Sequence, residues 1–369
     1  MAKDYKPPFR ADHVGSLLRP AALKEARRRY ADGALDAAGL MAVEDREIER
    51  IVSKQRELGL RGITDGELRR SWWHLDFLWG LDGVAEHQAD FGTGFVGATP
   101  RTAGVRVDGK IGFSGHAMLE HYAFLHERAR GVAKLTIPAP SALLGRPVLP
   151  PIDARAYPTR AELYADLGAA YRAAVRAFAA AGCRYLQLDE VFIAMLCDEK
   201  YRDKMRARGD DPDALLHVYA QLINTAIADA PADMTITLHL CRGNFKSTYM
   251  GAGGYETVEE VLFNEIDVDG YFMEYDDERS GGFEPLRALP KGKRVALGVV
   301  TTKRGALESK DELKRRIDAA AKFADLDQLC LAPQCGFAST EEGNLVTEDE
   351  QWAKLERIVS VADEIWGQR

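Results

Sequence analysis

The chain has 369 residues, of which 46% are hydrophobic and 29% are charged, so it is long enough to bury a large core. Its net charge is -8, from 49 basic and 57 acidic residues, and it has no basic cluster among aromatics, which argues against a nucleic-acid partner. No apolar run approaches the roughly 20 residues that cross a bilayer, and the N-terminus has no apolar signal core, so we expect a cytoplasmic protein without a membrane partner.

Short β-rich runs alternate with amphipathic helical stretches along the whole chain. The runs predicted as strands are residues 9–13, 62–65, 133–137, 184–188, 235–241, 270–274, 294–300 and 328–332. The stretches predicted as helices are residues 40–58, 160–181, 212–230, 257–264, 310–324 and 347–366. Repeated strand–helix units predict an α/β fold, a single closed (β/α)8 TIM barrel that forms one domain over residues 1–369. An open Rossmann sheet is the alternative, but no Gly-x-Gly-x-x-Gly motif follows an early strand.

The chain is longer than the about 250 residues that such a barrel needs, so it must carry additional segments. We place the main insertion after the second strand, at approximately residues 71–131, where several glycines and a possible hairpin at residues 104–113 accompany a group of tryptophans. A smaller, glycine-rich insertion at residues 243–255 follows the fifth strand. Neither segment has the composition of a linker between domains.

Polar and ionisable residues lie at the C-terminal end of almost every predicted strand. In barrels of this type the chemistry gathers at the C-terminal ends of the strands. In chain order, the residues at these ends are Asp12, His13 and Ser16; Asp65 and Glu67; Ser141; Asp189 and Glu190; His239 and Cys241; Glu274; Thr301, Thr302 and Lys303; and Cys335. This edge is therefore the predicted active site.

Four of these residues form a set that is typical of a zinc site. His239 and Cys241 are two residues apart on one strand, so their side chains point to the same face and can share a partner. Glu274 and Cys335, at the ends of other strands, complete a set of His, Cys, Glu and Cys, and imidazole with thiolate suits zinc better than magnesium or calcium. The five cysteines are odd in number and scattered, which is no disulfide framework. The alternatives are core packing of the His-x-Cys pair and a closed structural metal site.

Several of these segments together resemble the catalytic half of cobalamin-independent methionine synthase, and more closely its short, single-barrel relatives, which include epoxyalkane:coenzyme M transferases. The resemblance rests on Arg10-Ala-Asp-His-Val-Gly-Ser16, Asp65-Gly-Glu67, Leu186-Gln-Leu-Asp-Glu190, His239-Leu-Cys241, Glu274 and Ala332-Pro-Gln-Cys-Gly-Phe337. It implies a methyltransferase or alkyltransferase that activates a thiol on Zn2+, most simply homocysteine in methionine biosynthesis.

The resemblance also implies roles for individual residues. The zinc ligands would be His239, Cys241, Glu274 and Cys335. The contacts to a small amino-acid thiol would be Ser16, Glu67 and Asp189, with carboxylates on the ammonium group and the amide near Ser16 on the carboxylate. Capping of the following helices is the alternative role of Glu67 and Asp189.

The sequence also departs from the family's pattern. It has no room for a second, N-terminal barrel that helps bind folate. Where the seventh strand of the long enzymes presents a histidine proposed as proton donor, this chain reads Gly298-Val-Val-Thr-Thr-Lys303, so Lys303 or Thr302 occupies that neighbourhood. The alkyl donor is therefore open among folate, a corrinoid-bound methyl group and an epoxide.

Further candidates come from position alone. His13 at the end of the first strand is a candidate to position the donor or carry a proton. Trp72 and Trp73 follow Glu67 and are candidates to line the pocket. Alternatively, they pack within the core of the insertion.

Other functions also stay open. One is an enzyme that transfers an alkyl group to another thiol such as coenzyme M. Another is a metal-free decarboxylase resembling uroporphyrinogen decarboxylase. A third is a non-catalytic protein in which zinc only stabilises the fold. The oligomeric state has no signal in the sequence.

Overall fold

A parallel sheet forms the centre of the protein in the computed structural model, which describes residues 6–88, 94–100 and 102–367. Six strands are hydrogen-bonded in the order β10-β9-β8-β7-β6-β5, and all neighbours are parallel. They are β5 (Leu135–Pro138), β6 (Tyr185–Glu190), β7 (Thr235–Leu240), β8 (Gly270–Glu274), β9 (Arg294–Val300) and β10 (Leu329–Pro333). Their residues are almost all buried, as expected for parallel strands covered on both faces. The α/β class with a parallel sheet is therefore confirmed.

A second parallel pair joins β1 (Gly62–Ile63) to β4 (Val132–Ala133). The predicted first strand, residues 9–13, is reduced to one bridge, in which Ala11 pairs in parallel with Leu331 of β10. The predicted run 133–137 is divided at Lys134 into β4 and β5. Closure of these pieces into a complete eight-stranded barrel stays a prediction.

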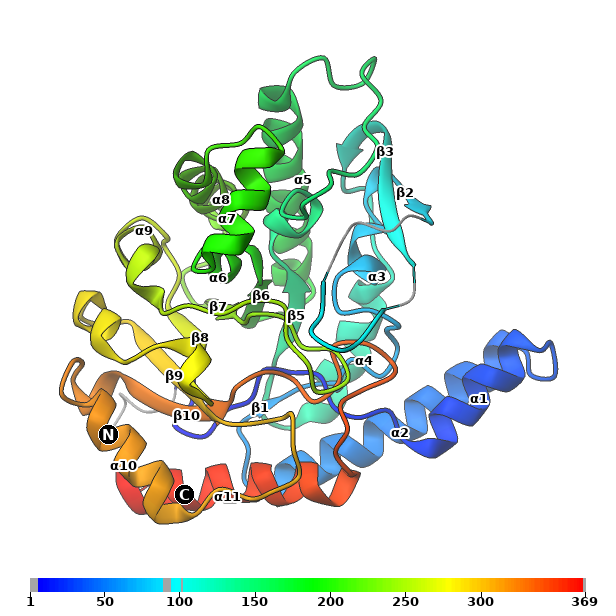
Figure 1. The fold of residues 1–369 in the computed structure, drawn as a ribbon. Coiled ribbons are helices and arrows are strands. Elements are labelled where there is room, and N and C mark those ends of the chain that lie inside the picture. Colours follow the sequence, from blue (N-terminus) through cyan, green and yellow to red (C-terminus); the bar gives the residue numbers. More distant parts are fainter. Residues whose placement is uncertain (1–5, 89–93, 101, 368–369) are drawn as a thin grey trace.

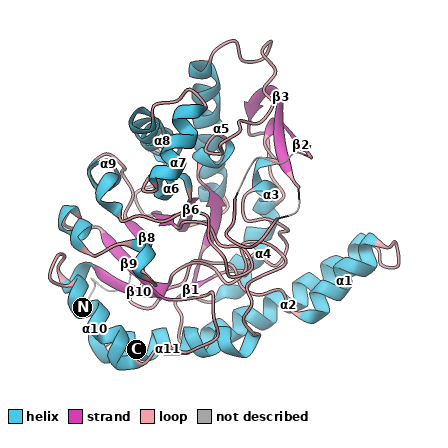
Figure 2. Cartoon of the chain, in the orientation of Figure 1, coloured by secondary structure: helices cyan, strands magenta, loops and turns pink. Residues whose placement is uncertain are grey.

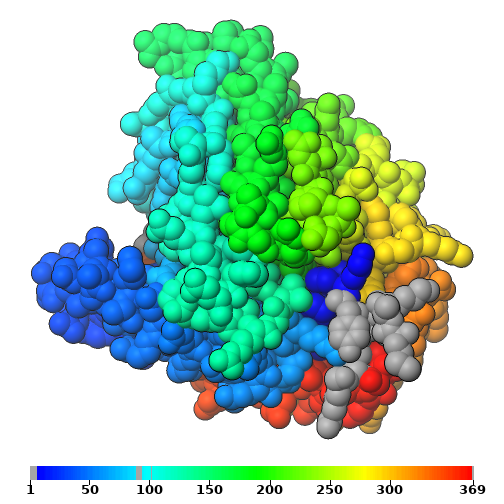
Figure 3. Space-filling model, turned by 180° about the vertical axis from the view of Figure 1, so that it is seen from behind, coloured from blue at the N-terminus to red at the C-terminus, as the bar shows by residue number. Residues whose placement is uncertain are grey.

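Helices surround the strands on the outside (Figures 1 and 2). They are α1 (Ala21–Ala31), α2 (Ala37–Glu57), α3 (Leu75–Leu78), α4 (Met118–Ala129), α5 (Arg160–Ala180), α6 (Phe192–Met195), α7 (Glu199–Ala207), α8 (Pro212–Ile227), α9 (Glu259–Asn264), α10 (Lys310–Ala320) and α11 (Glu348–Trp366). Side-chain caps define several of their starts: Thr347 and Glu350 form a reciprocal capping box on α11, and Ser309 caps α10. Helix α1 and the adjoining part of α2 project from the body, as Figure 3 shows from behind.

The segment between β1 and β4 contains an antiparallel pair, β2 (Asp82–His87) with β3 (Gly104–Gly112). The hairpin expected within residues 104–113 is wrong, because this stretch is one continuous strand whose partner lies earlier in the chain. That the segment is an insertion stays a prediction. No helix among the described residues has both the length and the apolar character needed to cross a membrane.

Candidate active site and metal centre

Three predicted metal ligands meet at the C-terminal edge of the sheet. His239 lies near the end of β7, Cys241 follows that strand directly, and Cys335 lies in the loop after β10. One ring nitrogen of His239 and the two Sγ atoms all lie within 4.8 Å of one another. Alternation along β7 explains part of this geometry, because residues 239 and 241 point to the same face. The sheet therefore brings together a His, Cys, Cys cluster.

The chemistry of this cluster fits a soft or borderline metal ion. Both ring nitrogens of His239 are buried and have no hydrogen-bond partner, which is unusual for a buried imidazole that packs only as core. The two cysteines are free, so both sulfurs can act as ligands. Interaction with the Cys241 thiol lowers the pKa of Cys335 well below its usual value, and the same interaction raises the pKa of Cys241. A thiolate beside an imidazole with unpartnered nitrogens is a donor set that zinc prefers.

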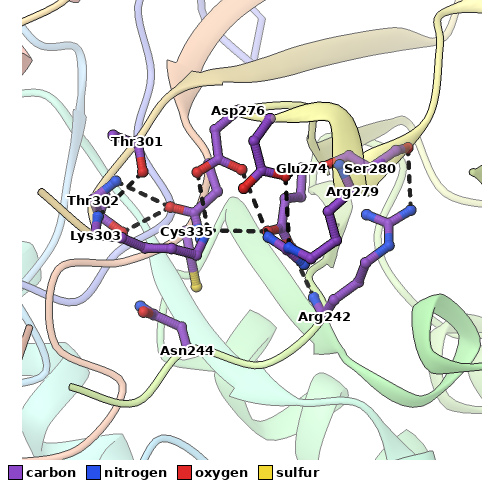
Figure 4. A network of polar contacts seen from close by, with 12 residues as sticks. Arg242, Asn244, Glu274, Asp276, Arg279, Ser280, Thr301, Thr302, Lys303 and Cys335 are labelled. Carbon is purple, nitrogen blue, oxygen red and sulfur yellow. Dashed lines mark hydrogen bonds and ion pairs between the residues drawn. The ribbon is translucent and has the colours of Figure 1, made fainter. Parts of the chain in front are cut away.

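Glu274 ends β8 beside this cluster, but its carboxylate is held by other residues (Figure 4). One oxygen, Oε1, accepts from Lys303 Nζ at 3.1 Å and from the Arg279 guanidinium. The other oxygen, Oε2, accepts from the backbone N–H of Arg242 at 2.8 Å. Burial alone would raise the pKa of Glu274, but Lys303 and then Arg279 outweigh it and lower that pKa to about 2. Among the described residues, the cluster of mutually close ligand atoms contains His239 and the two cysteines but not Glu274.

A cavity of about 420 Å³ opens directly over the cluster. Eight sequence-predicted site residues line it together, namely Ser16, Glu67, Trp72, Trp73, Asp189, His239, Cys241 and Cys335. Its remaining wall mixes small, polar and apolar residues and includes the aromatic side chains of Phe192 and Phe245. The volume is in the range of about 300–1,000 Å³ that is typical of small-molecule sites.

Two buried carboxylates face this cavity. Glu67 has a left-handed backbone, with φ of 57°, and its Oε1 accepts from Thr136 Oγ1 at 2.9 Å. Its other oxygen is buried without a partner, and burial raises the pKa of this carboxyl. Burial likewise raises the pKa of Asp189 to about 7, although Gln187 Nε2 donates to it at 2.7 Å. An incoming cation would compensate both groups, so the arrangement can bind an ammonium group.

Ser16 is tied to the loop that carries Cys335. The carbonyl of Ser16 accepts from the backbone N–H of Phe337 at 3.0 Å. The α-carbon of Gly336 lies so close to Ser16 that a Cβ added there would be 1.9 Å from the serine Oγ. Glycine at 336 therefore permits the close approach of these two segments.

The two predicted acid/base residues lie outside the residues that line the cavity. His13 is 1% exposed, and its Nε2 contacts the carbonyl of Gly62 at 3.2 Å. Burial, and secondly Lys134, lower the pKa of His13 to about 4, so the ring is neutral at neutral pH. Lys303 contacts Glu274 and also Asp276, whose Oδ2 lies 2.9 Å from its Nζ.

Several residues at the site were not found from the sequence. His74 and Arg146 contact each other and line the cavity. Asn244 also lines the cavity and donates to the carbonyl of Gly336 at 2.7 Å. Position offers some signal, because His74 follows the Trp pair and Asn244 follows Cys241 closely. No spacing rule indicates Arg146, which lies in a loop.

Comparison with known proteins gives consistent matches over nearly the whole chain. Residues 9–364 match the family described as "Cobalamin-independent synthase, Catalytic domain". The uncharacterized protein YxjH of Bacillus subtilis (strain 168) is 49% identical over 367 residues, which cover 99% of this chain and 96% of that protein. A 5-methyltetrahydropteroyltriglutamate–homocysteine methyltransferase of Bacillus velezensis is 22% identical over 349 residues, which cover 95% of this chain but 42% of that protein.

A solved structure is similar in both fold and sequence. It is described as the putative vitamin-B12 independent methionine synthase from Listeria monocytogenes, and it is 38% identical with a TM-score of 0.79. The match covers 98% of this chain and 99% of that chain.

Proposed function

The chain belongs to the family of cobalamin-independent methionine synthase catalytic domains, and on this premise we propose that it is a zinc-dependent methyltransferase whose acceptor is the thiol of homocysteine. The observation that carries the proposal is the cavity in which the cluster of His239, Cys241 and Cys335 lies together with Glu67 and Asp189. A thiol-activating centre and a cation-binding pair in one cavity match an amino acid that carries a thiol.

Glu67 and Asp189 bind the ammonium group of the substrate in this proposal. Both carboxylates are buried, and burial is the main cause that raises their pKa values, although Arg70 lies 3.8 Å from Glu67. An ammonium group supplies a positive charge with three donors. A sulfonate thiol such as coenzyme M would need basic partners at this place, so the two acids favour homocysteine over that alternative.

The three soft ligands fix the position of the reacting sulfur. Zn2+ held by His239, Cys241 and Cys335 would lower the pKa of a coordinated thiol, so that the sulfur reacts as a thiolate at neutral pH. The cluster itself is buried, which limits the access of water to that thiolate. The ammonium contacts and the sulfur position together orient the nucleophile toward the opening.

The aromatic wall suits the alkyl donor. Trp72, Trp73, Phe192 and Phe245 line the cavity, and Arg146 is the one Arg or Lys among its described lining residues. Such a wall can stack on a flat donor and keep water from the transferred methyl group. Folate, a corrinoid-bound methyl group and an epoxide all stay candidates for the donor.

The test is zinc content together with zinc-edge X-ray absorption, on the wild type and on Cys335→Ser, with and without homocysteine. We expect one zinc per chain, and a sulfur count that rises by one when homocysteine is added. Cys335→Ser should lose zinc or one sulfur ligand, whereas Cys183→Ser, which changes a buried cysteine remote from the cavity lining, should behave as wild type. Absence of zinc, or a metal shell indifferent to homocysteine, would contradict the proposal.

A further inference from the structure

A cation and a buried histidine contact each other in the wall of the cavity. Arg146 lies in the loop after the short helix η1 (Pro140–Leu143), and its guanidinium donates to the Nε2 atom of His74, at the start of α3. Both residues line the cavity, and His74 is 3% exposed. Neither residue takes part in binding homocysteine or zinc in the proposed function.

This contact fixes which nitrogen of His74 carries the proton. A guanidinium has donors only, so His74 Nε2 must accept from it. Burial, and secondly the charge of Arg146, lower the pKa of His74 well below its usual value, so the ring is neutral at neutral pH. In a neutral ring whose Nε2 accepts, the proton lies on Nδ1. That Nδ1 is buried without a hydrogen-bond partner, so His74 offers a donor that still lacks an acceptor.

The loop that carries Arg146 is fixed through its backbone. Arg208 Nη1 donates to the carbonyl of Leu144 at 2.8 Å and also to that of Arg146. The hydroxyl of Tyr201 donates to the carbonyl of Gly145, between them. Three successive carbonyls are therefore held by side chains from other parts of the chain. A guanidinium presented from a fixed backbone loses less conformational entropy when it binds a ligand.

Aromatic rings adjoin both members of the pair. The rings of Trp73 and His74 lie 4.4 Å apart between their centroids. Phe192 packs against the backbone next to Arg146, since a Cβ added at Gly145 would lie 2.1 Å from the Phe192 ring. Both aromatic residues line the cavity. A ligand can therefore place a flat group on this aromatic surface and an acceptor on the two donors.

The charge of the pair indicates which class of acceptor it binds. A neutral imidazole does not compensate the positive charge of a guanidinium, so the pair favours a negatively charged acceptor. In the proposed function, the ammonium group of homocysteine has partners at Glu67 and Asp189, and its sulfur has a partner at the metal cluster. Its carboxylate is expected at the amide near Ser16. An anion at this pair is therefore brought by the second substrate, the alkyl donor.

We propose that His74 and Arg146 form a subsite for an oxyanion, a carboxylate or a phosphate group, of the alkyl donor. The assignment to the donor rests on the proposed function, whereas the oxyanion subsite can be tested without it. A folate, which carries carboxylates, and a corrinoid that carries a phosphate group both meet this requirement. A simple epoxide is neutral and does not.

Titration of tryptophan fluorescence with three small probes tests the subsite, because Trp72 and Trp73 line the same cavity. The probes are benzoate, phenyl phosphate and the neutral benzamide, which share one aromatic ring. At least one of the two anions should bind to the wild type about tenfold or more tightly than benzamide does. The tighter of the two anions shows whether the subsite takes a carboxylate or a phosphate.

Variants of the pair test the cause of this preference. Arg146→Met should remove the preference for the anion over benzamide, and Arg146→Lys, which keeps the charge, should retain part of it. His74→Phe keeps a ring but removes the donor, and it should reduce the preference by about threefold. If Arg146→Met does not fold, the fall in His74→Phe decides.

The matched control is Arg155→Met, because Arg155 is 92% exposed and is not among the described residues that line the cavity. It should keep the wild-type preference, which excludes a general attraction of anions to the protein. Equal binding of the anions and benzamide would overturn the proposal. An unchanged preference in Arg146→Met, as expected if the anions bind only to zinc, would also overturn it.

Homocysteine binding distinguishes the two substrates. Arg146→Met should leave homocysteine affinity within about threefold of wild type, because the pair does not contact the acceptor. A loss as large as that for the anionic probe would place the subsite at the acceptor and overturn the assignment to the donor. A wild type that binds no zinc but keeps the preference for the anion would overturn the proposed function and leave the oxyanion subsite standing.

Discussion

Asp189 and His239 are register partners in the parallel pairing of β6 with β7. This pairing places a carboxylate that faces the cavity beside a side chain of the metal cluster. In the proposed function, two adjacent strand ends, which are rigid elements of the sheet, would set the distance between the ammonium group and the sulfur of the substrate. A site built in this way would select thiols by the length of the chain that joins their amino and thiol groups.

Asp189→Asn should weaken homocysteine binding while zinc remains bound. Loss of one charge-assisted contact is worth about 1.5–3 kcal/mol, which corresponds to an increase of about 10-fold to 150-fold in KM or Kd. The measurement is titration calorimetry of the zinc-loaded protein with homocysteine. The matched ligand is 4-mercaptobutanoate, which lacks the ammonium group, and its weaker binding should not change. Equal losses for both ligands would mean that Asp189 acts only on the structure.

Metal removal should abolish thiol alkylation and leave the fold largely intact. The ligands lie at or just after the ends of two strands, β7 and β10, that pack in the hydrophobic core through residues such as Leu238 and Leu331. The metal therefore joins elements that the core already holds. Dialysis against a chelator should lower Tm by only a few degrees, as followed by circular dichroism, and added Zn2+ should restore activity. Complete unfolding on chelation would instead indicate that the zinc site is structural and not catalytic.

Two strands could be predicted from the sequence to their last residues, whereas one predicted strand forms only a single bridge in the structure. Residues 270–274 and 294–300 are apolar runs that the structure keeps as β8 and β9. Around residues 9–13, the Asp12 side chain accepts from the backbone N–H groups of Phe9 and His13, at 3.0 and 2.8 Å. Those donors are satisfied locally, so the segment forms a bridge instead of a strand.

The site residues also divide into those that the sequence predicts and those that it does not. Residues at strand ends, such as Glu67 and Cys335, could be found because a parallel sheet brings all its strand ends to one edge. The partners of Glu274 could not, because Arg279 and Lys303 lie in loops whose conformation no periodicity predicts. Lys134 was also missed, although a charged residue within the apolar run 133–137 indicates a buried charge that needs a partner. Its Nζ lies 2.5 Å from the carbonyl of His13.

Stability should depend on pH through Glu190, which has a pKa raised by burial to about 7. The group binds its proton more tightly in the folded state, so its stabilising effect is complete below its unfolded pKa and is lost as the pH rises through about 7. Glu190→Gln keeps an acceptor for the N–H groups of Phe192 and Ile193, at 2.8 and 2.9 Å, and removes the charge. Relative to wild type it should gain stability from pH 5 to pH 8, by about 3 kcal/mol at most.

Urea denaturation of both proteins at each pH measures this gain. Glu127→Gln changes a side chain that is 72% exposed and should show no such trend. A constant difference between wild type and Glu190→Gln across the pH range would contradict the prediction.

Gly336→Ala should disturb the metal cluster and the thiol contact at once. A Cβ at residue 336 would lie 1.9 Å from Ser16 Oγ, so either Ser16 or the loop carrying Cys335 must shift. Such overpacking costs about 1–3 kcal/mol, and we expect lower zinc affinity together with weaker homocysteine binding. Chelator competition and calorimetry measure the two effects.

A matched control and a rescue test the cause. Gly94→Ala also changes a glycine that lines the cavity, but a Cβ there would meet nothing within 4 Å, so it should leave both affinities near wild type. Gly336→Ala/Ser16→Ala removes the hydroxyl oxygen that is in the way and should recover both affinities, because the substrate contact expected near Ser16 is a backbone amide that this substitution keeps. Recovery of zinc affinity without recovery of homocysteine affinity would mean that the Ser16 hydroxyl itself contacts the substrate.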